Sequence, residues 1–323
     1  MALIGYHASH EQHPPRRLLR DVQLAEAAGF AAVSSSDHLT PWSERQGESG
    51  FAWSWLGAAM QRTGVPFGVV CAPGQRYHPA IIAQAIATLL DLAPDRLWVA
   101  LGSGEASNEH ITGDRWPEKR VRNERLRQCV DVIRALLRGE EVTVDDLVRV
   151  DRARLWTLPA KPPDLIGAAL SVETARWCGG WADGLITVAR PPEELRRLID
   201  AFRDGGGAGK PVRVQVKVAW APTEDDALAG AYDQWRTNVL DPTLMADLER
   251  VEQFEAAAAY VRPDDLRPSV LVSSDPARHV AWLHALAEAG VDELFVHQVP
   301  VEQPAFIDVY GDKVLPELRE VMA

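Results

Sequence analysis

Polar side chains that could carry out acid–base chemistry gather in three short segments of this sequence. The first is Ser34-Ser35-Ser36-Asp37-His38, which runs on to Trp42. A histidine beside a carboxylate can act as a general base, because imidazole titrates near neutral pH and its neighbours orient it. The indole of Trp42 would then wall a ring-binding site. The alternative is a solvated loop in which Asp37 caps a turn and His38 is exposed.

The second segment is Gly102-Ser103-Gly104-Glu105-Ala106-Ser107-Asn108-Glu109. Its two glycines let the backbone approach a flat ring or a phosphate closely. Glu105 could donate a proton if burial raises its pKa. The run is not a dinucleotide fingerprint, because Ser107 replaces the last glycine of that pattern. A solvated turn is the other interpretation.

The third segment is His7-Ala8-Ser9-His10-Glu11-Gln12-His13. Three histidines in seven residues suggest a metal site. Their spacing, however, is not the H-x-H or H-E-x-x-H arrangement that places ligands on one face. We therefore expect no metal ligand here, and Glu11 is the residue of interest as a second carboxyl near a pocket. A metal-dependent barrel hydrolase stays an alternative.

Short apolar runs alternate with amphipathic stretches along the chain, a pattern typical of a parallel sheet built from βα units. The eight runs expected as strands are residues 3–7, 30–35, 65–71, 97–101, 164–168, 184–188, 212–219 and 293–298. The stretches expected as helices are residues 15–28, 51–62, 80–92, 118–138, 172–179, 193–203 and 306–322. Eight strands predict a TIM-type (β/α)₈ barrel, whose active site lies at the carboxyl ends of the strands. The three polar segments fall there.

The stretch 222–268 is acidic and helical in pattern, with no run typical of a strand. We interpret it as a helical insertion before the last strand. The whole chain, 1–323, is then expected to be a single barrel domain, which is an ordinary length for this fold.

Composition narrows the possible partners and the compartment. The 323 residues are 46% hydrophobic and 25% charged, with a formal net charge of −12, so we expect no nucleic acid and no anionic membrane surface as partner. No window approaches the roughly 18 apolar residues of a membrane span. The first residues are typical of a strand and not of a signal peptide. The three scattered cysteines predict a reducing compartment, the cytoplasm, and no disulfides or thiolate metal site.

Several longer stretches resemble the F420-dependent glucose-6-phosphate dehydrogenase group of the luciferase-like superfamily. The match is most specific in about the first 125 residues and patchier from about residue 140 to 268. The stretches that carry it are Gly5-Tyr6-His7-Ala8-Ser9 with Glu11-Gln12, Ser36-Asp37-His38 to Trp42, Arg76-Tyr77-His78-Pro79-Ala80, Gly102-Ser103-Gly104-Glu105 with Asn108-Glu109, and Asp308-Val309-Tyr310-Gly311.

The resemblance implies hydride transfer at a deazaflavin ring. It implies that His38 is the base that takes the substrate hydroxyl proton and that Glu105 is the acid facing the ring. Trp42 would support the reacting centre, and Glu11 falls on another active-site carboxylate of the group. The resemblance also implies a homodimer acting on a small-molecule substrate.

The same resemblance implies a set of cofactor contacts. The strand end Val69-Val70-Cys71 matches a segment that supports the ring, often through a non-proline cis peptide bond, and the turn from Ala168 to Ser171 matches the segment at the ribityl-phosphate end. The residues expected to contact the cofactor are Asp37, Val70, Cys71, Gly102, Ser103, Gly104, Asn108, Ala168, Ala169 and Ser171.

Two departures from the group's pattern bear on substrate and cofactor. Arg190 is the basic residue available where the group has a lysine for the sugar phosphate, and Ala169-Leu170 replaces a Gly-Gly phosphate turn. We therefore expect a small alcohol or carbonyl substrate other than glucose 6-phosphate, bound near Arg190, and either F420 or FMN as cofactor. An FMN-dependent monooxygenase and a non-catalytic flavin-binding protein are the alternatives.

Overall fold

A closed ring of strands forms the centre of the molecule in this computed structural model, which describes residues 2–322. Strand β8 pairs with β9 and so closes the sheet into a barrel. Within the described residues, eight parallel strands make up this ring: β1 (Leu3–Ala8), β2 (Val33–Ser35), β3 (Phe67–Cys71), β4 (Leu97–Leu101), β7 (Leu165–Ala168), β8 (Leu185–Val188), β9 (Val212–Ala219) and β11 (Glu293–Gln298). The predicted TIM-type barrel is confirmed.

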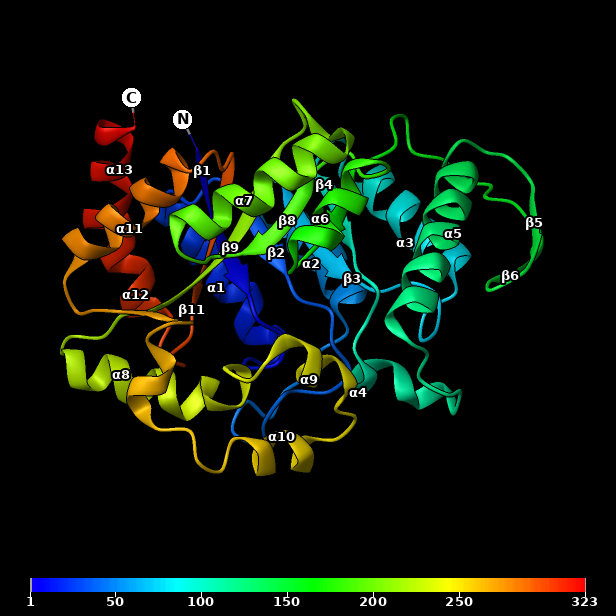
Figure 1. The fold of residues 1–323 in the computed structure, drawn as a ribbon. Helices are drawn as coiled ribbons and strands as arrows, with labels where there is room; N and C mark the ends of the chain where they lie inside the picture. The colour runs from blue at the N-terminus through cyan, green and yellow to red at the C-terminus, as the bar shows by residue number, and fades with distance from the viewer. Residues whose placement is uncertain (1, 323) are drawn as a thin grey trace.

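Helices cover the outside of the barrel and bury its outward-facing residues (Figure 1). No helix among residues 2–322 combines the length and the apolar character that a membrane crossing requires. The outer helices are α1 (Pro15–Ala28), α2 (Ala52–Arg62), α3 (Pro79–Leu92), α5 (Lys119–Leu137), α6 (Val172–Gly179), α7 (Pro192–Phe202), α11 (Pro276–Glu288), α12 (Pro304–Val309) and α13 (Leu315–Val321).

Helix α1 shows how the sequence specifies these elements. Pro15 stands in its first turn, where a missing N–H costs nothing, and Leu18, Val22 and Ala25 are buried on one face. Gly29 ends the helix in the left-handed region, with φ +99°, and its N–H caps the last turn. These bounds are the predicted ones.

Large aromatic side chains fill the half of the barrel that contains the amino-terminal ends of the strands. The rings of Trp98 and Phe295 lie 5.4 Å apart in an interior cluster. A Cβ at Gly5 would lie 2.5 Å from the Phe295 ring, and one at Gly68 would overlap the Trp98 indole, so these strands need glycine there. Nearer the carboxyl ends of the strands, the inward-facing residues are smaller or polar. The barrel is therefore filled at the amino-terminal ends of its strands and polar at their carboxyl ends.

A helical segment lies across the carboxyl ends of the strands, which is the mouth of the barrel. It comprises α8 (Glu224–Trp235), α9 (Pro242–Asp247) and α10 (Val251–Ala257), which Figure 1 shows on the same side as the short helix α4 (Ala106–Glu109). Helix α9 contacts α4. A two-residue strand, β10 (Leu271–Val272), then adds to β9. Treating 222–268 as an insertion within one domain stays a prediction.

Several elements differ from the sequence prediction, among them helix α11, which lies outside all the predicted helical stretches. Strands β5 (Val142–Asp145) and β6 (Arg149–Ala153) form an antiparallel hairpin that projects from the barrel and was not predicted. Strand β2 begins at Val33 and not at residue 30. The expected last helix divides into α12 and α13 around a π turn at Tyr310–Val314, because Pro316 has no N–H with which to continue the regular ladder.

Candidate active site

Glu11 and His38 form a buried pair at the mouth of the barrel. Glu11 follows β1 and His38 follows β2, and these strands are neighbours in the sheet. The His38 Nδ1 and Glu11 Oε1 atoms lie 2.8 Å apart, with side-chain exposures of 20% and 1%. The other Glu11 oxygen accepts hydrogen bonds from Ser9 Oγ at 2.7 Å and Ser36 Oγ at 2.9 Å. The carboxylate is thus fixed on both sides and orients the imidazole.

The two groups of this pair shift each other's pKa in opposite directions. Burial alone would lower the pKa of His38, but the Glu11 carboxylate raises it above its ordinary value. Burial alone would raise the pKa of Glu11, but His38 and the hydrogen bonds lower it well below its ordinary value. Nε2 of His38 forms no hydrogen bond with any residue in the described range. The imidazole can therefore exchange a proton with a ligand through Nε2 while Glu11 stabilises the charged form.

Trp42 is held between His38 and the helical segment over the mouth. Its ring meets the His38 ring edge-on at 4.4 Å and lies 5.8 Å from the ring of Trp235, which ends α8. Its backbone N–H donates to Gln46 Oε1 at 3.0 Å. The indole Nε1 is buried without a partner among the described residues. Trp42 therefore lies beside His38 at the mouth, and its predicted role as the wall of a ring-binding site stays a prediction.

Glu105 lies at the carboxyl end of β4, immediately before α4. Gly104 precedes it with φ +85°, a conformation that favours glycine. The Glu105 carbonyl accepts from the N–H groups of Asn108 at 3.1 Å and Glu109 at 3.2 Å, which fixes the turn. One carboxyl oxygen, Oε2, is buried and unpartnered within the described chain. It is available to a ligand in the mouth.

The side chains of Asp37 and Asn108 form hydrogen bonds with other residues of the chain. Asp37 accepts from the Tyr77 hydroxyl at 3.0 Å and pairs with Arg76 Nη2 at 3.4 Å. Burial raises the pKa of Asp37, although Arg76 opposes this shift. Asn108 Oδ1 accepts from the N–H of Leu39 at 2.8 Å. Both side chains hold the loop that carries His38, and the predicted cofactor contacts of Asp37 and Asn108 stay predictions.

Strands β3, β4 and β7 are neighbours in the sheet and end beside one another at the mouth. The Gly102 N–H donates to the Cys71 carbonyl at 2.9 Å, and a Cβ at Gly102 would lie 3.7 Å from Ala168 Cβ. Val70 and Ala168 border the interior cluster, and Ser103 is half-buried. Burial raises the pKa of the Cys71 thiol well above its ordinary value. Residues 2–322 contain no cis peptide bond, so the cis bond that is frequent at this segment in the resembled group is absent from Val69–Cys71 here.

The turn after β7 is tied into the protein. Ala169 N–H donates to the Ile186 carbonyl at 3.0 Å, and Ser171 Oγ caps α6 by accepting from the Thr174 N–H at 3.2 Å. Arg190 reaches this turn and donates to the Leu170 carbonyl at 3.2 Å. Its Nε is buried without a partner in the described chain. The structure thus brings Arg190 and the predicted phosphate turn together.

The histidines of the first segment have separate surroundings. His7 Nδ1 lies 2.8 Å from Ser34 Oγ, and the His10 ring meets Trp55 edge-on at 4.9 Å. Burial lowers the pKa of His7 to about 3, of His10 to about 4 and of His13 to about 3. Over residues 2–322, no group of three or more His, Cys, Asp or Glu side chains is placed to hold a metal ion.

Sequence reasoning missed Lys217, His297 and Trp235. Lys217 on β9 lies opposite His297 on β11, whose ring is 4.8 Å from that of His7 and 4.9 Å from that of Trp235. Burial lowers the pKa of Lys217 to about 8. The sequence contained a signal for Lys217, because it alternates with valines along β9. The valines pack in the core outside the barrel, so Lys217 faces its interior.

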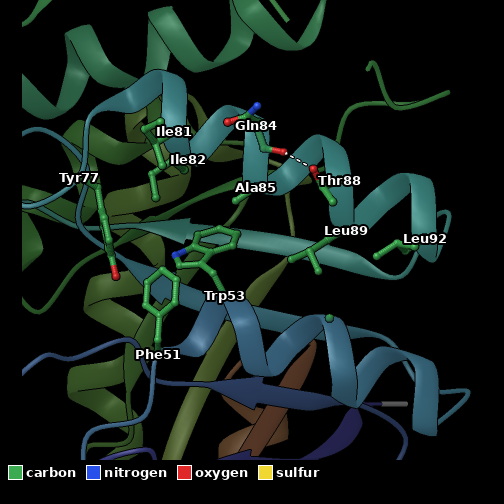
Figure 2. A pocket seen from close by; sticks show the side chains of 11 residues that line it. Phe51, Trp53, Tyr77, Ile81, Ile82, Gln84, Ala85, Thr88, Leu89 and Leu92 are labelled. Atoms are coloured by element: carbon green, nitrogen blue, oxygen red, sulfur yellow. Dashed lines mark hydrogen bonds between the residues drawn. The ribbon is translucent and has the colours of Figure 1, made fainter. Parts of the chain in front are cut away.

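A separate groove of about 340 Å³ lies outside the barrel, between α2 and α3. Figure 2 shows Phe51, Trp53 and Tyr77 at one end of it and Ile81 and Leu92 along α3. Its lining is almost wholly apolar, and Phe51, Ile81 and Leu92 are more than half exposed, at 53%, 57% and 52%. This groove is not part of the mouth.

Several polar atoms of the residues at the strand ends lack a protein partner. Trp42 Nε1, Glu105 Oε2 and Arg190 Nε are buried polar atoms without partners in the described chain. Such atoms are costly unless a ligand satisfies them. Gly102, after β4, and Ala168, at the end of β7, present no side chain larger than a methyl group.

Comparisons with known proteins cover nearly the whole chain. A family model described as luciferase-like monooxygenase matches residues 2–293. An F420-dependent glucose-6-phosphate dehydrogenase of Beutenbergia cavernae is 36% identical over 330 residues, which are 99% of this chain and 98% of the relative. An F420-dependent hydroxymycolic acid dehydrogenase of Mycobacterium tuberculosis is 36% identical over 327 residues, covering 98% of this chain and 88% of that protein. A solved F420-dependent secondary alcohol dehydrogenase, in complex with an F420-acetone adduct, superposes with a TM-score of 0.92 at 29% identity and covers 98% of this chain and 99% of its own.

Proposed function

Because the chain belongs to the luciferase-like monooxygenase family, we propose that it is an oxidoreductase that uses F420 or FMN to move a hydride between the ring and a small alcohol or carbonyl compound. The observation that carries this proposal is the buried Glu11–His38 pair, with His38 Nε2 free, in one mouth with Glu105. The F420-dependent names of the relatives support the cofactor and the dehydrogenase activity.

Residues of the chain itself would take up and return the substrate proton that accompanies hydride transfer. The bound ring supplies the site that accepts or gives the hydride at its carbon face. His38 Nε2 takes the proton of a substrate hydroxyl, and the Glu11 carboxylate stabilises the imidazolium that results. Glu105 serves as the acid on the ring side, and Trp42 confines the substrate beside His38. For reduction of a carbonyl the same proton moves in the opposite direction.

The strand ends would hold the ring. Val70, Cys71, Gly102, Ser103 and Gly104 would support its face. The turn with Ala168, Ala169 and Ser171 would meet its phosphate end, and Asp37 and Asn108 would fix the loop beside it. Arg190 would bind the substrate or the cofactor tail. Because Arg190 and Ala169-Leu170 stand where the resembled group has lysine and Gly-Gly, we propose a substrate other than glucose 6-phosphate.

An FMN-dependent monooxygenase is the second candidate, favoured by the family description. Oxygen consumption separates the two activities. With reduced FMN in air, the dehydrogenase proposal predicts no oxygen uptake above that of free flavin. In an anaerobic assay with oxidised F420 and a secondary alcohol, the dehydrogenase proposal predicts that the absorbance of the oxidised cofactor falls. Enzyme-dependent oxygen uptake coupled to substrate hydroxylation would favour the monooxygenase instead.

We also propose a homodimer and a place in the cytoplasm. The apolar groove between α2 and α3 supports self-association, because a second copy of the same face would cover Phe51, Ile81 and Leu92. Cys71, Cys129 and Cys178 are all free and buried, which suits a reducing compartment.

A further inference from the structure

Lys217 lies inside the barrel on the side away from the strand ends proposed to support the ring. It stands on β9, whereas Val70 lies on β3 and Gly102 follows β4, and four steps around the sheet separate β3 from β9. Its register partner is His297 on β11, and its ammonium lies 5.6 Å from the centre of the Trp235 ring. Trp235 also contacts Trp42, the wall beside His38. Lys217 therefore belongs to the half of the mouth in which a substrate would lie.

Two other charged groups of the barrel have protein partners of opposite sign. Arg213 pairs with Glu293 at 2.8 Å, and His38 with Glu11 at 2.8 Å. The ammonium of Lys217 forms no ion pair within 4.0 Å and no hydrogen bond with any residue of the described range 2–322. Lys217 is nonetheless only half-exposed.

The neighbours of Lys217 do not neutralise it. Burial lowers the pKa of both His7 and His297, which leaves their rings uncharged at neutral pH. Arg190, after the adjacent strand β8, adds a second positive charge nearby, and Glu105 acts on Lys217 only from beyond ion-pair distance. A partly buried cation without a partner is costly, so proteins keep one where a ligand completes the pair.

We propose that Lys217 is a specificity-determining residue whose ammonium binds an oxyanion, a carboxylate or a phosphate, carried by the hydroxy or oxo substrate. This inference rests on the proposed function for the identity of the reaction, but the binding of the oxyanion does not. Lys217 would anchor one end of the substrate while His38 Nε2 takes the proton at the other end. The substrate class is then a small hydroxy or oxo acid or a phosphate ester, in preference to a neutral alcohol.

A binding experiment tests the anion site independently of turnover. The chain has five lysines, Lys119, Lys161, Lys210, Lys217 and Lys313, so lysine labelled with ¹³C at Cε gives a spectrum simple enough to resolve. The Lys217→Arg variant identifies the Lys217 signal by its loss. The protein is titrated with acetate and with inorganic phosphate, both with and without F420. Chloride at equal ionic strength is the control. We expect a saturable shift of the Lys217 signal alone. No saturable shift, or equal shifts of all five signals, would overturn the proposal.

A preference experiment tests the role in the reaction and identifies the anion. The carboxylate pair is 3-hydroxybutyrate and its neutral isostere 4-methyl-2-pentanol, and the phosphate pair is glycerol 3-phosphate and glycerol. We expect the ratio of kcat/KM between the anionic and the neutral member to fall about 30-fold or more in Lys217→Met. Lys217→Arg should restore most of the ratio, and Lys161→Met, at an exposed lysine, should not change it.

The two failures can be told apart. If wild type binds neither F420 nor FMN, the proposed function fails, while the shift of the Lys217 signal still decides the anion site. If wild type binds a cofactor and Lys217→Met keeps the same anionic preference, the inference about Lys217 is wrong and the proposed function stands.

Discussion

At the scale of single residues, Glu11 controls the state of the base. Its carboxylate is fixed by Ser9 and Ser36, so it presents one oxygen to His38 in a constant position. The raised pKa of His38 follows from this contact. Alcohol oxidation needs neutral His38, so the rate should rise with pH through a pKa above the ordinary 6.5.

Replacing Glu11 by glutamine keeps the shape of this contact and removes its charge. Without the carboxylate, burial lowers the pKa of His38, so the acidic limb of the pH–rate profile should move to lower pH. The imidazolium also loses its stabilising partner, so kcat should fall about 10²-fold. F420 reduction by a secondary alcohol, measured from pH 5 to 9, gives both quantities. Glu44→Gln, at an exposed residue of the loop after β2, is the control. An unmoved limb in Glu11→Gln would show that Glu11 does not set the pKa of His38.

At the scale of elements, α2 and α3 present an apolar face that a second copy would cover. Ile81 stands in the first turn of α3, near Tyr77, and is 57% exposed. Ile81→Glu should convert a dimer to a monomer, because a buried unpaired carboxylate costs several kcal/mol. Light scattering after gel filtration measures the mass directly. Leu147→Glu, at an exposed apolar residue in the turn of the β5–β6 hairpin, should leave the mass unchanged. A wild-type protein that runs as a monomer would contradict the dimer.

Elements with strong local signals were predictable from the sequence. The proline, the apolar stripe and the terminal glycine of α1 fixed its bounds. The β5–β6 hairpin has a weaker signal, because Val142, Val144 and Val150 alternate with polar residues but the two strands are only four and five residues long. The π turn in the last helix follows from Pro316, whose missing N–H is a local signal in the sequence.

At the scale of the whole molecule, barrel closure assembles the site. His38, Glu105 and Glu11 were predictable because polar residues after barrel strands meet at one end. Trp235 and His297 were not, because their contacts join segments about 200 residues or more away from Trp42 and His7. The protein partners of Asp37 and Asn108 likewise required coordinates, since Arg76, Tyr77 and Leu39 come from other turns.

The central claim is that this mouth holds a flavin-type ring, and cofactor binding tests it most directly. Purified protein is titrated with F420, followed by its fluorescence, and separately with FMN. We predict saturable one-to-one binding of at least one of them with a Kd of about 1 μM or tighter. Competition between the two cofactors, and weakening of either by Gly102→Val, would place the ring beside Ala168. Failure of both cofactors to bind at micromolar concentration would contradict the account.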